Sequence, residues 1–139
     1  MKYFSCPLGI AAMMKMSLAL VFAAFLSSCA SIAPPAPKGS VDHVVMMWQK
    51  NPGNLKDRKQ IADAIERLRV IEGITILDYG TAVASERPVV DDSFDIGLLV
   101  RFKNVDALHA YETDPRHVKE VKGVLLPLTK KIQVYDFTR

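Results

Sequence analysis

Tyr111 and His117 are the two side chains whose types and spacing could support proton-transfer chemistry. They stand six residues apart, and between them Asp114-Pro115 is a typical helix start, with aspartate as the N-cap and proline in the first turn. This arrangement can direct both polar tips into one pocket. A neutral imidazole can act as a general base, and a phenol can donate a hydrogen bond to an enolate oxygen. Tyr111 and His117 are therefore candidate catalytic and ligand-binding residues.

An architectural role for the same two residues stays open. His117 falls in the first turn of its helix, where the positive end of the helix dipole disfavours an imidazolium and favours the neutral base. His117 could instead hydrogen-bond the backbone at the helix start, with Tyr111 packed as an amphipathic core residue. His43 is expected on the same strand face as Val45 and Met47. It is either a third ligand-binding residue or a core histidine whose ring nitrogens are hydrogen-bonded within the protein.

The remaining polar residues form no recognisable metal or nucleotide motif. No pair among the histidines and aspartates has metal-ligand spacing on one element, so we expect no metal site. The sequence has no glycine-rich phosphate loop, nucleophile elbow or Cys/His pair, and we expect no cofactor. It also has no basic run and no interleaving of aromatic with basic residues. Nucleic acid is therefore not an expected partner.

Residues 1–28 resemble a bacterial lipoprotein signal peptide. Lys2 and Lys15 precede an apolar run from Met16 to Leu26, which is shorter than the roughly 20 apolar residues of a membrane span. The run ends in Leu26-Ser27-Ser28-Cys29, which resembles a lipobox whose cleavage leaves Cys29 to be acylated. An ordinary signal peptide or an uncleaved anchor is the alternative. We therefore expect a lipid-anchored protein of the bacterial cell envelope. The outer membrane or the periplasmic face is favoured, because Ala30 and Ser31 directly after Cys29 are not acidic.

The segment after Cys29 reads as a tether rather than as part of the fold. Residues 29–40 are rich in proline, which favours an extended, semi-rigid stalk between lipid and domain. Loss of residues 1–28 would remove two lysines and no acid, so the net charge would fall from +3 to +1. Both cysteines, Cys6 and Cys29, lie at or before the start of the tether. The domain over residues 41–139 must therefore be held by its hydrophobic core alone.

The elements that position the candidate residues follow from the periodicity of the apolar residues. Alternation runs without a break from Phe94 to Phe102, which is the strongest strand signal in the chain. Asn54, Asn104 and Asp114 are expected helix N-caps, and Gly73 is a natural helix stop. The pattern predicts strands over 41–48, 74–84 with a possible irregularity at Gly80, 94–102 and 131–137, and helices over 54–70, 104–111 and from 114 past 125.

This order of elements is β-α-β-β-α-β with the second helix broken in two. It is typical of an α+β, ferredoxin-like fold, in which an antiparallel sheet carries helices on one face. The first strand has apolar residues on both faces, so both of its faces are expected to be covered. No further segment of residues 41–139 is left to cover the second face. We therefore expect a homodimer joined sheet to sheet.

Taken in this order, the segments resemble the stress-responsive A/B barrel family, the dimeric α/β-barrel (Dabb) domains. The resemblance implies a ferredoxin-like protomer and a dimer whose two sheets form a barrel. The family includes stress-associated proteins without an assigned reaction and a plant polyketide cyclase, and the same barrel also hosts cofactor-independent monooxygenases. The matching segments are Asp42-His43-Val44-Val45, Gly73-Ile74, Phe94 to Phe102, Ala107-Leu108-His109-Ala110-Tyr111, Asp114-Pro115-Arg116-His117-Val118 and Val134-Tyr135-Asp136-Phe137.

The resemblance also bears on the candidate site. The reactive tyrosine and histidine of the cyclase map onto Tyr111 and His117. The family commonly reads His-Pro-x-His where this chain has Asp114-Pro115-Arg116-His117. The first histidine of that motif has thus become a helix-capping aspartate, which adds a carboxylate near the expected pocket.

Three functions remain open at this stage. The first is a dimeric envelope lipoprotein, of the stress-response type, that binds a small apolar molecule through His43, Tyr111 and His117. The second is a cofactor-free cyclase or lyase, in which His117 removes a proton next to a carbonyl and Tyr111 steadies the enolate. The third is a purely structural, stress-protective protein in which the same motif serves folding.

Overall fold

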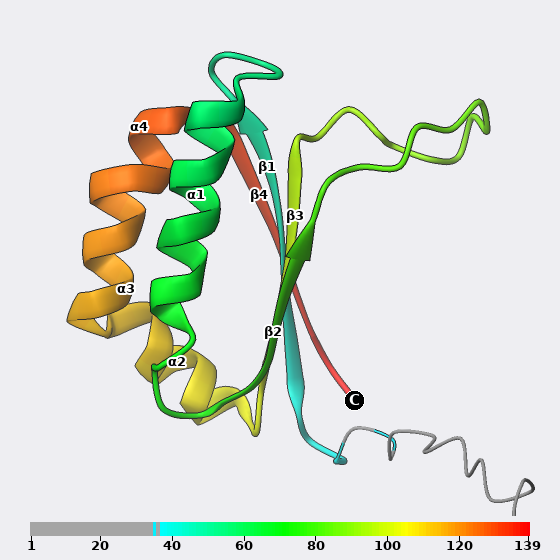
Figure 1. Ribbon diagram of the computed structural model, residues 1–139. Coiled ribbons are helices and arrows are strands. Elements are labelled where there is room, and N and C mark those ends of the chain that lie inside the picture. Colours follow the sequence, from blue (N-terminus) through cyan, green and yellow to red (C-terminus); the bar gives the residue numbers. More distant parts are fainter. Residues whose placement is uncertain (1–34, 36) are drawn as a thin grey trace, which may run out of the picture. The chain divides into compact units, whose positions relative to one another are not determined.

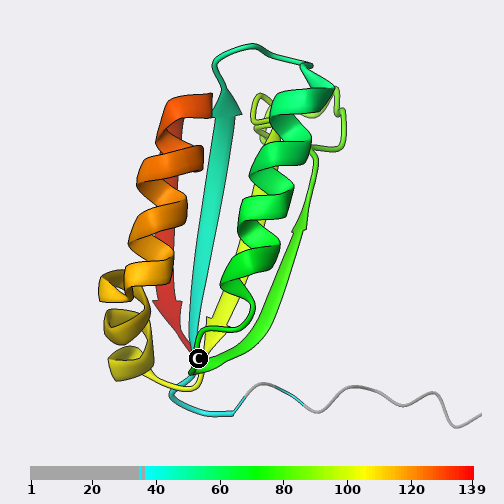
Figure 2. The same cartoon turned by 60° about the vertical axis from the view of Figure 1, so that its left-hand side comes forward.

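The computed structural model describes residue 35 and residues 37–139. The proposed signal peptide, the acylation site at Cys29 and most of the tether lie outside the described residues. Residues 35–139 form one compact unit, a sheet of four strands with helices packed on one of its faces (Figures 1 and 2). The elements are β1 Val41–Gln49, α1 Leu55–Leu68, β2 Ile74–Gly80, β3 Ile96–Phe102, α2 Val105–Thr113, α3 Pro115–Glu120, η1 Val121–Leu125, α4 Leu126–Leu128 and β4 Thr129–Thr138.

All strand pairs are antiparallel, and the strand order is β2-β3-β1-β4. The first and last strands of the domain are therefore neighbours, and each αβ crossover lays its helix on the same face. This confirms the predicted α+β, ferredoxin-like fold. It also confirms that the second helical region is divided, since α2 ends at Thr113 and α3 begins at Pro115.

The predicted helix starts are present with their capping bonds. The Asn54 side chain accepts hydrogen bonds from the backbone N–H groups of Lys56 and Asp57, and Asp114 accepts one from Arg116. Asn104 caps α2 in the same way. These bonds satisfy N–H groups that would otherwise lack partners in the first turn. They fix where α2 and α3 begin, and so set the angle at which Tyr111 and His117 meet.

Gly73 ends the α1 region for two independent reasons. Its φ of 89° lies in the left-handed region that ordinary side chains rarely adopt. In addition, a Cβ at this position would lie 2.8 Å from the Cβ of Ala107, closer than real carbon contacts. The chain can therefore turn from α1 into β2 beneath α2 only with glycine here.

Several strand boundaries differ from the prediction, and β3 begins at Ile96 rather than at Phe94. β2 ends at Gly80 rather than continuing to Ala84, because its only partner is β3 and the ladder ends where Gly80 faces Gly97. The irregularity expected at Gly80 lies instead between Ile74 and Ile76. β4 is longer than predicted and begins at Thr129. Strand length is thus set by the available partner and not by local sequence.

The core lies between the sheet and α1, α2 and η1. Strand residues alternate, so every second side chain of β1 and β3 points toward the helices. Met47, Val100 and Phe102 are completely buried on this side, and Ile61 and Ile65 of α1 meet them from the helix layer. This one core therefore both holds the domain together and frames the walls of any internal site.

The helical region after α3 contains a wide turn that the sequence pattern did not predict. Residues Val121–Leu125 form a short π-helix, η1, followed by the single turn α4, which contains Pro127. The hydroxyl of Thr129 donates to the carbonyl of Leu125 at 2.7 Å and closes the end of this region. Single π-turns are frequent at functional sites. η1 lies beside the candidate residues, as the next subsection describes.

The opposite face of the sheet is apolar but has no covering element among the described residues (Figure 1). Ile76, Tyr135 and Phe137 keep 40%, 56% and 47% of their surfaces exposed there. Only the helix side of β1 is covered within the described chain, although both faces of this strand are apolar. Among the described residues, no helix has the length and apolar character to cross a membrane.

Candidate functional site

A cavity of about 450 Å³ lies between the sheet and the helices α2, α3 and η1. This volume suits a small molecule. The walls are mainly aliphatic, and three of the five lining residues with ring or acid groups are those singled out from the sequence. The lining residues are His43, Val45, Leu68, Leu98, Tyr111, Glu112, His117, Val121, Leu125, Ile132, Val134 and Asp136.

Tyr111 is 1% exposed, and its ring packs 4.9 Å from that of Phe102. Burial raises the pKa of its phenol far above the ordinary value, so the hydroxyl keeps its proton at any physiological pH. No hydrogen bond from this hydroxyl to another part of the described chain contributes to that pKa shift. Buried tyrosine hydroxyls usually have a partner. The phenol is thus a donor available to a molecule in the cavity.

His117 lies directly against Tyr111, with 4.2 Å between the two ring centroids. Its Nδ1 is 3.2 Å from the carbonyl oxygen of Glu112. A carbonyl can only accept, so Nδ1 carries the hydrogen and Nε2 is left with a free lone pair. Burial lowers the pKa of His117, and the nearby His43 lowers it further, against an opposing contribution from the Glu112 carbonyl. The lowered pKa of this half-buried residue favours the neutral imidazole near neutral pH.

His43 completes the group of three rings, at 6.0 Å from the centroid of Tyr111. Its Nδ1 is 2.6 Å from the carboxylate of Asp136 on the neighbouring strand. This bond holds the ring in one orientation and places the Nδ1 hydrogen toward the acid. The structure thus brings His43, Tyr111 and His117 together in a single cavity.

Asp136 belongs to a segment that resembles the Dabb family, but it was missed in the sequence as a partner of His43. The two residues are 93 positions apart and become opposite neighbours through the antiparallel register of β1 and β4. Period-two alternation alone would have placed Asp136 on the same face as Val134. The alternation pattern does not give the register of β4 against β1, and so it could not show that Asp136 lies opposite His43.

The aspartate that replaces a histidine in the family motif does not line the cavity. The Arg116 side chain holds the carboxylate of Asp114 at 2.6 Å, and the hydrogen bonds from Arg116 lower the pKa of Asp114 to about 2. The added carboxylate is thus neutralised by its neighbour at the helix start. Within residues 35 and 37–139, no three histidine, cysteine or acidic side chains gather closely enough to hold a metal ion.

Comparison with known protein families identifies the domain. Residues 41–139 match the family described as the Stress responsive A/B Barrel Domain, or Dabb. The chain belongs to the Dabb family. No curated protein matches the chain.

Solved structures share the Dabb fold at low sequence identity. A Dabb family protein from Mesorhizobium loti is 23% identical with a TM-score of 0.62, over 73% of this chain and 98% of that one. A dimeric ferredoxin-like protein of unknown function from Thermobifida fusca is 14% identical with a TM-score of 0.60, over 73% and 92%. A hydroxynitrile lyase from Passiflora edulis is 20% identical with a TM-score of 0.65, over 74% and 95%. At these identities the likeness establishes the fold alone.

Proposed function

We propose that this Dabb domain binds a small, largely apolar molecule that carries an oxygen acceptor, such as a carbonyl group. The observation that carries the proposal is the protonated hydroxyl of Tyr111, whose raised pKa is caused by burial alone and which borders an aliphatic cavity. Such a donor is satisfied by an acceptor on the bound molecule. His43 and His117 would supply the remaining polar contacts.

A second candidate function is acid–base catalysis on the same molecule. It is favoured by the free Nε2 of neutral His117 beside the phenol of Tyr111. His117 would take a proton from the carbon next to a carbonyl, and the electron pair would move onto the carbonyl oxygen. Tyr111 would stabilise that oxygen by its O–H donor. The Dabb-like fold of a hydroxynitrile lyase is compatible with enzymatic activity on this scaffold.

Acetophenone is a suitable probe for both functions, because it is small and apolar and has one carbonyl with exchangeable α-hydrogens. Binding is measured by NMR on the full chain, and catalysis by the rate at which the acetophenone methyl group takes up deuterium from D₂O. The variants are Tyr111→Phe and His117→Ala. The matched control is His109→Ala, which removes an exposed histidine of α2 outside the cavity.

Binding that falls about tenfold in Tyr111→Phe and is unchanged in His109→Ala is the expected result. Deuterium uptake above the buffer rate that disappears in His117→Ala would assign catalysis as well. Equal binding by wild type and Tyr111→Phe would contradict the binding proposal. If both site variants changed only thermal stability, the structural, stress-protective role would be supported instead.

The proposal includes a homodimer that is anchored in the bacterial envelope through Cys29. The dimer is supported by the uncovered apolar face of the sheet and by the dimeric state of several proteins with this fold, including those from Bacteroides fragilis and Jannaschia. The anchor is supported by the Leu26-Ser27-Ser28-Cys29 sequence. Palmitate labelling tests it: Cys29→Ser should abolish incorporation, while Cys6→Ser should not. Labelling that survives Cys29→Ser would contradict the anchor.

A further inference from the structure

A groove separate from the central cavity runs along the first half of α1. It consists of two adjoining pockets of about 270 and 350 Å³, which share Arg58 and Thr81 in their lining. The first pocket is lined by α1 and the end of β2, and the second by α1 and the segment that joins β2 to β3. Neither pocket shares a lining residue with the cavity that contains Tyr111 and His117. The groove is therefore a second candidate binding site.

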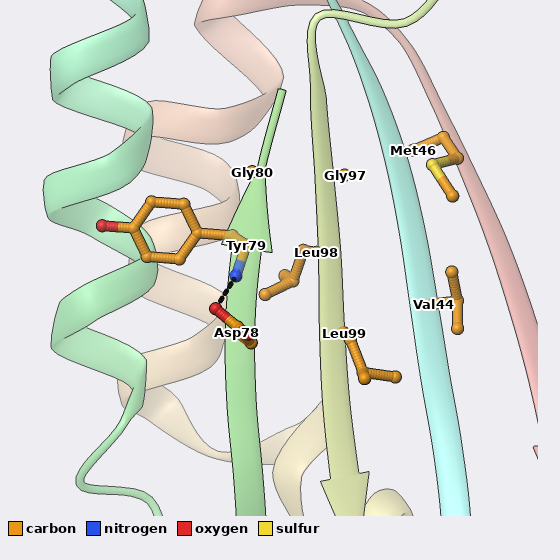
Figure 3. Close-up of a pocket in the computed structure, with 8 residues that line it drawn as sticks. All are labelled: Val44, Met46, Asp78, Tyr79, Gly80, Gly97, Leu98 and Leu99. Atoms are coloured by element: carbon orange, nitrogen blue, oxygen red, sulfur yellow. Dashed lines mark hydrogen bonds between the residues drawn. The ribbon is translucent and has the colours of Figure 1, made fainter. Parts of the chain in front are cut away.

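The first pocket has mainly apolar walls. Figure 3 shows the ring of Tyr79 reaching from β2 toward α1, while Gly80 beside it adds no side chain. Leu55 and Ile96 also line this pocket, and Leu55 keeps 73% of its surface exposed. An apolar group in the pocket would remove part of this exposed surface from water, which is favourable. This half of the groove is thus suited to an apolar part of a ligand.

Arg58 lies where the two pockets join. It is half-buried, and its buried Nε has no hydrogen-bond partner. In the part of the chain that the structure describes, no ion pair includes this guanidinium. A partly buried charge without a counterion is destabilising, and a guanidinium presents its N–H donors in a planar fork that matches a carboxylate. Arg58 is therefore suited to bind a carboxylate on another molecule.

The second pocket carries two acidic side chains opposite Arg58. Asp92 accepts a hydrogen bond from the backbone N–H of Ser85 at 2.8 Å, and Asp95 accepts one from the N–H of Gln49 at 2.8 Å. Each bond involves Oδ2 alone and holds the carboxylate in a fixed position. Neither aspartate forms an ion pair with Arg58, although all three line the same pocket. The two acids are thus positioned to receive a positively charged group.

The charges of the groove match a zwitterion better than a simple ion. The two basic residues of the lining are Arg58 and Lys59, and the two acidic ones are Asp92 and Asp95. A simple anion would be repelled by the aspartates, and a simple cation by the basic pair. An α-amino acid carries a carboxylate and an ammonium group on one carbon, and its side chain leaves that carbon in a third direction. The position of Arg58 between an acidic pocket and an apolar one agrees with this arrangement.

We propose that the groove binds an α-amino acid with an apolar side chain. Its carboxylate binds Arg58, its ammonium group binds Asp92 and Asp95, and its side chain lies against Leu55 and Ile96. Pockets of 270 and 350 Å³ are at the small end of ligand sites, which span roughly 300–1,000 Å³, and this limits the ligand to about the size of an amino acid. The site is independent of the molecule proposed for the central cavity.

The same carboxylate and side chain occur at the end of a peptide, which lacks the ammonium group at that residue. Three probes distinguish the two sources. L-Phenylalanine has all three groups, phenylalaninamide lacks the carboxylate, and N-acetylphenylalanine lacks the ammonium group. Each is titrated into the isotope-labelled full chain in mild detergent, and binding is followed by NMR. The aromatic ring of the probe shifts the signals of nearby residues and so reports where it binds.

The expected result is a dissociation constant for L-phenylalanine below about 1 mM, with shifts around Arg58, and binding of each analogue weaker by at least about tenfold. Equally tight binding of N-acetylphenylalanine would overturn the free amino acid and indicate a peptide end instead. Equally tight binding of phenylalaninamide would overturn the role of Arg58. Shifts confined to Tyr111 and His117 would place the probe in the central cavity, and an absence of shifts at about 10 mM would exclude the site.

Substitutions provide a second readout. Arg58→Gln should weaken phenylalanine binding at least about tenfold, whereas Arg58→Lys should retain part of the affinity because the charge remains. The matched control is Lys56→Gln, which removes a positive charge from the same helix outside both pockets and should bind as the wild type does. Wild-type affinity in a folded Arg58→Gln chain, or an equal loss in Lys56→Gln, would overturn the proposal. The three probes on the wild-type chain decide the question if a variant fails to fold.

Discussion

On the helix side of the sheet Phe102 is completely buried, whereas on the other side Phe137 keeps 47% of its surface exposed. The two phenylalanines belong to the same sheet but point to opposite faces, and Phe137 lies on the edge strand β4. The helix side is closed by α1, α2 and η1 but retains a cavity with polar groups at its centre. The other side is open, and on it the guanidinium groups of Arg101 and Arg139 are paired with the Asp42 carboxylate. In the proposed function, the first face encloses a small molecule and the second meets the sheet of a second copy.

The largest expected difference between the two faces concerns stability. Phe102→Ala should lower the free energy of unfolding by about 3–5 kcal/mol, because it removes a fully packed ring and leaves a cavity. Phe137→Ala should change it by less than about 1 kcal/mol at protein concentrations where the chain is monomeric. Urea unfolding followed by circular dichroism measures both. Equal losses would mean that the two faces are equally packed within one protomer.

The open face should be the more sensitive one in association. Val44→Lys places a charge at the centre of the proposed interface and should raise the dimer dissociation constant at least about 100-fold, since an unpaired charge is costly to bury. Unfolding of the monomer should be little affected, because the new side chain points to solvent there. Sedimentation equilibrium checks the prediction. An unchanged dissociation constant would exclude this face from the interface.

The enclosed face should be visible in the titration of His117. Burial lowers its pKa, so NMR should place its titration midpoint below the ordinary value of 6.5, and urea should restore that value. Since the unfolded chain binds the proton more readily, stability contributed by neutral His117 is present above pH 6.5 and is lost as pH falls toward the folded pKa. A midpoint at or above 6.5 in the folded protein would contradict the neutral-base assignment.

The smallest expected effect separates the hydroxyl of Tyr111 from its ring. Tyr111→Phe should leave the free energy of unfolding within about 0.5 kcal/mol, because the hydroxyl has no partner to lose within the described chain. Tyr111→Ala should lower it by about 3 kcal/mol, because the buried ring is lost as well. Thermal and urea unfolding of both variants decide this. A large loss in Tyr111→Phe would point to a structural hydrogen bond.

Much of the fold was predictable because its signals are local. The alternation that ends at Phe102 marks β3, and the capping residues Asn54, Asn104 and Asp114 mark three helix starts. Each of these signals acts within a few residues of the chain. The end of β2 at Gly80 was predicted wrongly because it depends on where its partner strand stops, which the local sequence does not contain.

In the candidate site, too, the contacts set by local sequence were predictable, and those set by strand pairing were not. Tyr111 and His117 could be paired in advance, since one helix junction positions both of them. The bond between His43 and Asp136 could not, because it depends on the register of strands at opposite ends of the domain. That register also shifts between Trp48 and Gln49, which no alternation pattern reveals. The role of each assembled residue in binding or catalysis stays a prediction for the experiments above.

The π-helix η1 has a consequence for how this domain could change over evolutionary time. Val121 and Leu125, at its two ends, both line the cavity. A π-turn spans one residue more than an α-turn, so deletion of a single residue here would convert the wall into an ordinary α-helix. Such a deletion would alter the shape of the cavity while the sheet and the three ring residues stay in register. The domain could thus acquire a new ligand preference by a change in helix length.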